Sequence, residues 1–409
     1  MKKGIKTDLG KIAAEVGVTP LEAPAKIKKK QSQLIIGVPK ASSFQELRVS
    51  LTPASVSLLV ARGNEVFVQS GAGEGSNYYD ADYTEAGAQI AYSSQELFKK
   101  SRIIVMVTPP TEEEMDVMSP GQIIMSPLHL PTLEAKTIKK LMSKKVTCMA
   151  YEYLKDESGT YPMVRTMGEI AGNASVLIAA EYLSNVHNGK GVLLGGVAGV
   201  PPTKVVILGA GVVGEYAART ALGMGAIVKV FDNNTYKLMR LQNNLNQRIF
   251  TSILDPKVLM NELEDCNVAI GALHSKEGRT PIMVTESMVS HMKNGAVIID
   301  VSIDQGGCFE TSDVTSHDKP TFRKYGVVHY CVPNIASRVS RTGSQAVSHI
   351  VTPILLDGSD YGGIERYLWD NEFVRHGLYI YNGSLTNQYL GDRFGIKYTD
   401  LDLLLAANI

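Results

Sequence analysis

The 409-residue chain is longer than the roughly 250–300 residues at which a single hydrophobic core stops growing, so its length predicts two domains. Lysine plus arginine and aspartate plus glutamate number 41 each, and this zero net charge argues against nucleic acid or an anionic membrane as partner and favours a small-molecule substrate. No apolar run approaches the roughly 18 residues of a membrane span.

The first 33 residues are rich in lysine and end in a basic run at 26–30. We interpret this extension as a solvated arm, with a binding patch as the alternative. It lacks the apolar segment and cleavage site of a signal peptide. The four cysteines lie far apart, with no histidine at zinc-ligand spacing near them. We therefore expect reduced thiols, no metal site and a cytoplasmic location.

Short apolar runs alternate with helical patterns from residue 34 onward. Strands are predicted at 34–38, 65–69, 103–107 and 122–125, and helices at 52–62 and 133–142. The first helix has a clear start, because Thr52 is a good N-cap and Pro53 suits the first helical position. This alternation predicts an α/β domain with a parallel sheet.

A second alternating block begins near residue 164. It contains a helix of small residues at 171–183, a glycine-rich loop at 191–199, and strands at 204–208, 227–231, 268–270 and 297–301. Beyond residue 340 the pattern is helical, at 344–356 and 401–407, and we expect this tail to fold back onto the first domain. The prediction is two Rossmann-like domains with parallel sheets, in which an NAD-binding domain (164–340) is inserted into a catalytic domain (34–163 and 341–409).

A GxGxxG motif lies between the strand at 204–208 and the helical pattern that follows it. Gly209 allows the tight turn, Gly211 allows the backbone to approach a pyrophosphate, and Gly214 allows helix and strand to pack closely. Val212 and Val213 open the helix, where free N–H groups face the phosphates. The motif therefore predicts a dinucleotide site, with a glycine turn that binds nothing as the alternative.

Asp232 ends the next strand, 18 residues after Gly214. A carboxylate there accepts hydrogen bonds from the ribose hydroxyls and repels a 2′-phosphate. Asn233 and Asn234 follow it, in place of an arginine that would pair with that phosphate. The cofactor is therefore predicted to be NAD.

Hydride transfer at a carbon that bears oxygen or nitrogen needs an acid/base group, and a small amino or keto acid also needs a cation for its carboxylate. Arg48 follows the first strand, His129 follows the strand at 122–125, and Asp304 follows the strand at 297–301. We take these three as candidates. Each also has a structural interpretation: a surface arginine, a structural histidine, and an aspartate that caps its own turn.

Six stretches of the chain carry a resemblance to a known family: RVSLTP at 48–53, GAGEGS at 71–76, LHL at 128–130, GVLLGGVAGV at 191–200, GAGVVG at 209–214 and DVSIDQGGCFE at 300–310. Over nearly all of residues 34–409 the chain resembles the alanine dehydrogenase family, with the NAD-binding subunit of nicotinamide nucleotide transhydrogenase as a relative. The resemblance implies reversible oxidative deamination of L-alanine to pyruvate and ammonium by NAD, in a cytoplasmic homo-oligomer that is commonly a hexamer.

Carried over by position, the resemblance implies that Arg48 binds the substrate carboxylate, His129 is the acid/base group, Asp304 assists the water and the amine, and Asp232 holds the ribose. One position departs from the family pattern. Where the family has a catalytic lysine, this chain has Thr108, which offers the substrate only a neutral hydrogen bond. Smaller departures lie at 171–173 and 334–341.

The leading hypothesis is an alanine dehydrogenase whose substrate lies in the cleft between the domains. Because of Thr108, two alternatives stay open. One is a dehydrogenase for another amino or keto acid. The other is a catalytically weak homologue that binds NAD(H) as a sensor or assembly partner.

Overall fold

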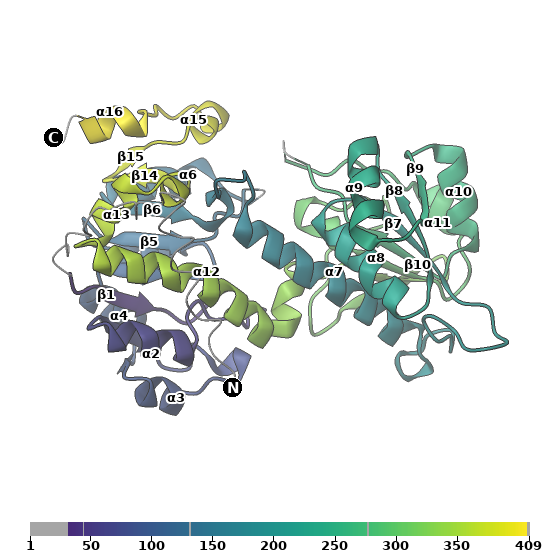
Figure 1. Cartoon of the computed structure of the whole chain (residues 1–409), viewed down its shortest axis with the longest axis horizontal. Coiled ribbons are helices and arrows are strands. Elements are labelled where there is room, and N and C mark those ends of the chain that lie inside the picture. Colours follow the sequence, from purple (N-terminus) through teal and green to yellow (C-terminus); the bar gives the residue numbers. More distant parts are fainter. Residues whose placement is uncertain (1–31, 44, 131, 276–277, 407–409) are drawn as a thin grey trace, which may run out of the picture.

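The computed structural model describes residues 32–406, except 44, 131 and 276–277. Residues 1–31, which include most of the expected N-terminal extension, lie outside the described residues. Figure 1 shows two lobes, each built on its own sheet, with the helices α7 (Pro162–Leu183) and α12 (Ser340–Asp360) running between them. None of the helices in the described part of the chain is long and apolar enough to cross a membrane.

The first domain contains an eight-stranded sheet in the order β15-β14-β6-β5-β4-β1-β2-β3. Its strands are β1 (Ile35–Val38), β2 (Glu65–Gln69), β3 (Gln89–Ala91), β4 (Ile103–Val105), β5 (Ile123–Ser126), β6 (Thr147–Ala150), β14 (Leu378–Tyr381) and β15 (Ser384–Leu385). The six strands from the N-terminal part are parallel, whereas β14 pairs antiparallel with β6 and β15 antiparallel with β14. The C-terminal part of the chain thus completes this sheet.

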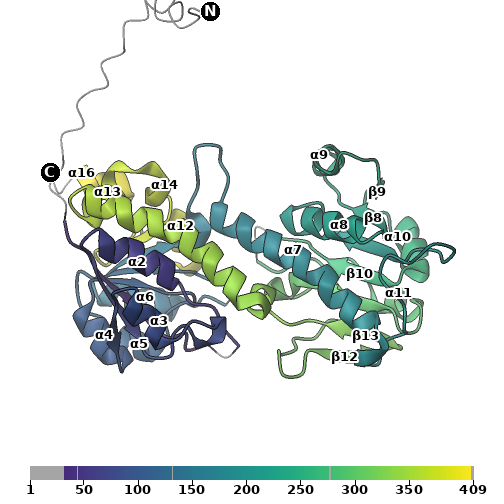
Figure 2. The ribbon, with the colours of Figure 1, turned by 60° about the horizontal axis from the view of Figure 1, so that its bottom comes forward.

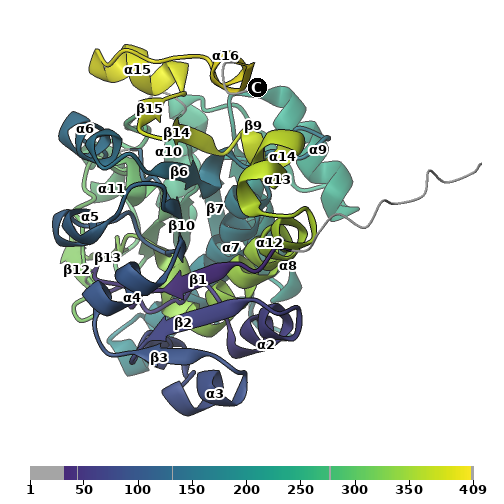
Figure 3. The ribbon, with the colours of Figure 1, turned by 90° about the vertical axis from the view of Figure 1, so that its left-hand side faces the viewer.

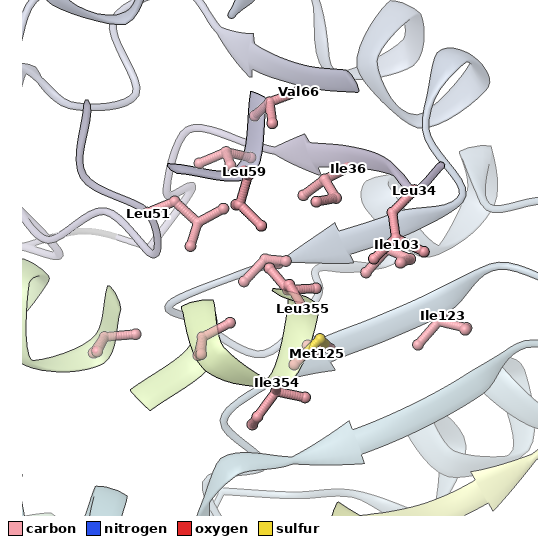
Figure 4. Packing of buried hydrophobic residues seen from close by; sticks show 14 of the residues in the cluster. Leu34, Ile36, Leu51, Leu59, Val66, Ile103, Ile123, Met125, Ile354 and Leu355 are labelled. Carbon is pink, nitrogen blue, oxygen red and sulfur yellow. The ribbon is translucent and has the colours of Figure 1, made fainter. Parts of the chain in front are cut away.

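Helices cover both faces of the first sheet (Figure 3). On one face lie α4 (Ser94–Lys100), α5 (Glu112–Val117) and α6 (Ala135–Ser143), and on the other lie α2 (Pro53–Ala61), α12 and α13 (Ile364–Asp370). The helix α2 begins where the sequence predicts, because the Thr52 hydroxyl accepts the Ser55 N–H and Pro53 fills the first position. Figure 4 shows how Leu59 of α2 and Leu355 of α12 pack with Ile36 of β1 into one buried cluster.

The remaining helices of this domain are short: α3 (Asp80–Glu85), α14 (Glu372–Arg375), α15 (Gln388–Phe394) and α16 (Leu401–Ala406). Single turns of 3-10 helix, η1 (Glu74–Ser76) and η2 (Tyr151–Tyr153), lie in its loops. The turn η2 comes directly after β6 and therefore lies at the carboxyl end of the sheet, which is where ligands bind in α/β domains.

The second domain contains a seven-stranded sheet in the order β12-β13-β11-β10-β7-β8-β9. Its strands are β7 (Lys204–Leu208), β8 (Ile227–Phe231), β9 (Phe250–Ser252), β10 (Val268–Gly271), β11 (Val297–Asp300), β12 (Thr321–Lys324) and β13 (Val327–Tyr330). All pairs are parallel except β12 with β13. The strand order reverses between β7 and β10, and a crevice at the carboxyl ends of such neighbours is the usual nucleotide site.

The helices of the second domain are α8 (Val212–Gly223), α9 (Thr235–Leu245), α10 (Pro256–Asp265) and α11 (Glu286–Ser290), with 3-10 turns η3 (Asn185–His187), η4 (Val301–Gln305) and η5 (Ile335–Val339). The long helix α7 packs closely on α8, because Gly172 has no side chain where a Cβ would lie 2.4 Å from the Val213 carbonyl oxygen. Figure 2 shows α12 lying along the first lobe and α7 extending along the second, with the two helices beside each other where the lobes meet.

The expected α/β architecture with mostly parallel sheets is confirmed, and the strands at 204–208 and 227–231 have the predicted bounds. The tail differs from its helical expectation, since it also contributes β14 and β15. The strand β14 has four residues, β15 has two, and both have antiparallel partners, so neighbouring strands and not local propensity stabilise them.

Candidate active site between the two domains

A cavity of about 310 Å³ lies between the two domains. The first domain contributes Arg48, His129 and Glu152 to its wall, and the second contributes Ala272, Ser302 and Asp304. Methionines of α7 form part of the floor. The structure therefore brings three predicted residues, Arg48, His129 and Asp304, around one cavity that both domains enclose.

The glycine loop has the geometry that a dinucleotide's diphosphate requires. Gly209 has φ +113°, and a Cβ on it would lie 2.4 Å from the Ala272 oxygen. A Cβ on Gly214 would lie 1.9 Å from the Gly209 oxygen, whereas a Cβ on Gly211 would meet nothing within 4 Å. The loop is thus closed on its inner side and open at Gly211, so the residues present fit NAD.

The helix α8 starts at this open side. Gly211 is its N-cap and Val212 its first residue, and the Glu215 N–H makes the first intrahelical bond, to the Gly211 oxygen. The N–H groups of Val212 and Val213 therefore precede the helical hydrogen-bond ladder, and such groups bind anions. Val213 also lines the cavity, so helix start and cavity are continuous.

Asp232 is buried at the end of β8 and supports the glycine loop. One carboxylate oxygen accepts the Ala210 N–H at 2.8 Å and the other accepts the Asn234 N–H at 2.8 Å. Each oxygen has a second lone pair, which leaves capacity for a ribose hydroxyl. The Lys237 ammonium lies 4.0 Å from the same carboxylate, a cation that the sequence interpretation did not consider.

Arg48 is 7% exposed and its guanidinium is held by a neighbouring carboxylate. Glu46 accepts the Arg48 Nε–H at 2.8 Å and the Nη2–H at 2.6 Å. Burial alone would raise the pKa of Glu46, but the hydrogen bonds and the charge of Arg48 outweigh it and lower that pKa. The remaining nitrogen, Nη1, contacts the Met167 sulfur at 3.2 Å and is the part of the guanidinium that a substrate can still engage.

Serine hydroxyls attach the Arg48 loop to η5 and α12. The Leu47 N–H donates to the Ser337 hydroxyl at 3.0 Å, and that hydroxyl donates to the Gln45 oxygen at 2.7 Å. Farther along, the Val49 and Thr52 N–H groups donate to the hydroxyls of Ser344 and Ser348, at 2.9 and 3.1 Å. The loop that carries Arg48 is therefore fastened along its length.

Asn334 links the two walls of the cleft. Its side-chain Nδ2 donates to the second oxygen of Glu46 at 2.7 Å, and its backbone N–H donates to Asp304 Oδ1 at 2.9 Å. Asp304 is exposed to the open cleft, but the protein groups around its carboxyl desolvate it and raise its pKa, although this N–H and the nearby charges of His129 and Arg48 act to lower it. Arg48, Glu46, Asn334 and Asp304 thus form one chain of polar contacts across the interdomain cleft.

His129 follows β5 and lies exposed at the mouth of the cavity, with a left-handed backbone at φ +49°. Its N–H donates to Glu152 Oε1 at 2.9 Å, and the Leu128 N–H donates to both oxygens of Glu152, at 2.8 and 2.9 Å. The charges of His129 and Asp304 interact across the cleft. An imidazole and a carboxylate can therefore both reach a ligand in this cavity.

Thr108 is buried after β4 and does not line the cavity, whereas its neighbour Val107 does. The cavity wall at this point is therefore apolar.

Among the described residues, no group of three or more His, Cys, Asp or Glu side chains is placed to hold a metal ion. His274, which lines the cavity, has its pKa lowered by burial and by the nearby charge of Lys237.

The sequence interpretation missed Glu46, Glu152 and Asn334. Glu46 is two residues from Arg48, and that spacing is the one signal in the chain that pointed to it. Glu152 and Asn334 are separated from their partners by 23 and 288 residues, so no local pattern indicates them.

Comparison with known proteins matches both parts of the chain to one family. The model described as "Alanine dehydrogenase/PNT, N-terminal domain" matches residues 37–171, and "Alanine dehydrogenase/PNT, C-terminal domain" matches residues 175–388. The alanine dehydrogenase of Staphylococcus saprophyticus is 39% identical over 373 residues, which cover 91% of this chain and all of that protein. The alanine dehydrogenase of Methanococcus maripaludis is 37% identical, with the same coverage.

Comparison with solved structures points to the same family. One described as L-alanine dehydrogenase is 37% identical, with a TM-score of 0.82 over 88% of this chain and 99% of its own. A transhydrogenase from Sinorhizobium meliloti, at 22% identity and a TM-score of 0.74, covers 87% of this chain and 99% of its own, and shares the fold.

Proposed function

Because the chain belongs to the Alanine dehydrogenase/PNT family, we propose that it is an NAD-dependent oxidoreductase that converts L-alanine reversibly to pyruvate and ammonium. The observation that carries this proposal is the convergence of Arg48, His129 and Asp304 on one cavity that extends to the glycine loop. Relatives of 37–39% identity that span nine tenths of the chain support alanine as the substrate.

In the proposed mechanism Arg48 anchors the substrate carboxylate through Nη1, the nitrogen that Glu46 leaves available. Glu46 holds the guanidinium through its two other N–H donors, so the guanidinium has little freedom to rotate. The bound substrate carboxylate is therefore oriented as well as attracted. Gly209, Gly211, Val212, Val213, Gly214 and Asp232 would hold NAD, which would supply the acceptor for the hydride of the substrate's Cα. The enclosing walls of both domains exclude bulk water from this step.

His129 is the proposed acid/base group. It takes a proton from the water that attacks the iminium carbon and returns a proton to the departing amine. Asp304, on the opposite wall, accepts hydrogen bonds from that water and from the amine. Desolvation in the cleft raises the pKa of this carboxyl, and the charge of His129 acts against that rise.

Thr108 supports one alternative, a substrate other than alanine. The site lacks a second cation where the family has a lysine, and Arg48 is already paired with Glu46. A substrate that depends less on its carboxylate and more on the apolar wall, which includes Val107, Met163 and Met167, would suit this cavity. The third possibility, an NAD(H) sensor with little turnover, follows from the same loss of charge.

The assay is NADH formation by the purified protein with a panel of amino acids. Turnover of alanine that is lost in His129→Ala supports the proposal. Turnover of another amino acid alone favours the first alternative, and NAD binding by calorimetry without turnover favours the sensor. No heat on titration with NAD or NADH would contradict all three.

We also propose the division into a catalytic domain of residues 34–163 and 341–409 and an NAD-binding domain of residues 164–340, supported by the two separate sheets.

A cytoplasmic homo-oligomer, a hexamer as in the family, is proposed on two further observations. The four cysteines are free and buried. Apolar side chains at Leu177, Leu193 and Val197 are more than half exposed, which suits a subunit contact.

A further inference from the structure

Glu152 lies in the wall of the cavity but directs its carboxylate at backbone amides. It belongs to η2, which follows β6, the strand paired with β5 on the parallel side. Its Oε1 accepts both the Leu128 N–H at 2.8 Å and the His129 N–H at 2.9 Å, and its Oε2 accepts the Leu128 N–H at 2.9 Å. One carboxylate therefore holds two successive amides of the loop that carries His129.

The backbone of His129 needs such support. Its φ of +49° is in the left-handed region, which non-glycine residues adopt only rarely. On the other side of the loop, the His129 carbonyl accepts the Thr132 N–H at 3.1 Å and the Thr132 hydroxyl at 3.3 Å. Leu128 is buried and anchors the loop to the core. The direction of the imidazole thus depends on a backbone conformation that Glu152 stabilises from the cavity side.

We propose that Glu152 is a positioning residue, which fixes the backbone of His129 so that the imidazole faces the substrate. This inference rests on the proposed function, because it assigns to Glu152 an effect on the reaction that passes through His129. Both carboxylate oxygens accept hydrogen bonds from the loop amides, so the role that this geometry assigns to Glu152 is to orient its neighbour. A misplacement of about 1 Å in a reacting group can lower the rate about 10²-fold.

The test compares Glu152→Gln with Glu152→Ala in the purified full chain. The Gln variant keeps an oxygen that reaches both amides, so we expect kcat within about threefold of the wild type. The Ala variant leaves both amides without their acceptor, and we expect kcat to fall about 10²-fold. KM for NAD should stay unchanged in both variants, because the glycine loop lies in the other domain.

A double variant separates positioning from a general structural role. In the His129→Ala background, Glu152→Ala should cause no further loss of kcat, because two residues that act through one imidazole are not additive. Glu114→Ala is the matched control. It removes a carboxylate of the same domain that is more buried than Glu152 and accepts the Thr111 N–H at 2.8 Å outside the cavity, and it should leave kcat unchanged.

The inference is wrong if the losses of kcat from the two substitutions add in the double variant. It is also wrong if Glu152→Gln is as slow as Glu152→Ala, because that result would assign proton transfer to Glu152 itself. A crystal structure of Glu152→Ala gives a second readout that needs no turnover: His129 should leave the left-handed region. If the wild type turns over no amino acid, the proposed function fails, and this structural readout still decides whether Glu152 fixes the loop.

Discussion

Glu46 and Arg48 lie in the same loop, and the Glu46 carboxylate accepts hydrogen bonds of 2.8 Å from Arg48 Nε and 2.6 Å from Nη2. Both side chains are at least nine tenths buried. A buried charge is tolerated when it is paired with an opposite charge. Removal of one partner is strongly destabilising, because it leaves the other charge buried and unpaired. Glu46, which does not itself line the cavity, therefore stabilises Arg48 in the cavity wall.

Glu46→Ala should destabilise the protein strongly, since it leaves the buried guanidinium without its partner, and the expected loss is about 3–5 kcal/mol of unfolding free energy. Urea denaturation followed by circular dichroism measures it. The control is Glu96→Ala, which removes the partner of Lys100 near the surface and should cost much less stability, because surface ion pairs contribute little. Equal losses for the two variants would show that burial of the Arg48 pair has no special cost.

Asp304→Asn should slow the reaction and stabilise the protein at neutral pH. Because the pKa of Asp304 is raised, the folded state binds this proton more tightly than the unfolded state, so ionisation at higher pH weakens the fold. The neutral amide removes that penalty and keeps an oxygen for the Asn334 N–H. We expect kcat to fall about 10²-fold, because the amide orients the attacking water and the amine less well than the carboxylate does.

The stability part of this prediction is a difference between two pH profiles. The melting temperature of Asp304→Asn should exceed that of the wild type at pH 7, and the gap should close as the pH falls below the ordinary aspartate pKa of 3.8. A variant that is less stable than the wild type at pH 7 would show that the carboxylate is stabilised by its ionised partners instead.

Two glycines of the same loop should respond differently to alanine. Gly211→Ala adds a methyl group where the protein has nothing within 4 Å, so stability should change by about 0.5 kcal/mol or less while the Kd for NAD rises at least about tenfold. Gly214→Ala places a Cβ 1.9 Å from the Gly209 oxygen, and this clash should cost about 1–3 kcal/mol of stability. Thermal melts with and without NAD distinguish the two effects.

Thr108→Lys tests the departure from the family pattern. A cation that reaches a substrate carboxylate past Val107 contributes about 1.5–3 kcal/mol, so KM for alanine should fall about 10- to 100-fold. Thr108→Met, of similar length and without charge, is the control and should not lower KM. If both variants behave alike, the effect comes from packing around this buried position and not from charge.

How far the sequence predicts this site depends on how local each contact is. Gly209 to Gly214 and Asp232 are separated by one βα unit, and the strand, turn and helix pattern was enough to locate them. Arg48 and His129 follow β1 and β5 of one parallel sheet, whose topology places the carboxyl ends of these strands at the same edge. Asp304 follows β11 of the second sheet and meets them only because the two domains face each other across the cavity. The roles of these residues came from the resemblance to the family and not from spacing.

The remaining features depend on contacts that no window of sequence contains. Asn334 reaches Glu46 across 288 residues, and Glu152 reaches His129 from a neighbouring strand. The short strand β3 and the pair β14 and β15 have no strong pattern of their own, and neighbouring strands stabilise them. Packing therefore decides these parts of the fold and of the site, and the sequence reveals them only through the assembled structure.

The serine contacts along the Arg48 loop determine where the molecule can bend. Ser337, Ser344 and Ser348 bind the loop from 45 to 52 to η5 and to the first turns of α12, so these segments travel as one piece. The turn η5 is also attached to the nucleotide-binding lobe, because Ile335 packs in the core of that lobe and Arg338 pairs with Glu181 of α7. The loop that carries Arg48 is therefore coupled to both lobes, and a motion that widens the cleft has to break contacts on one side of η5.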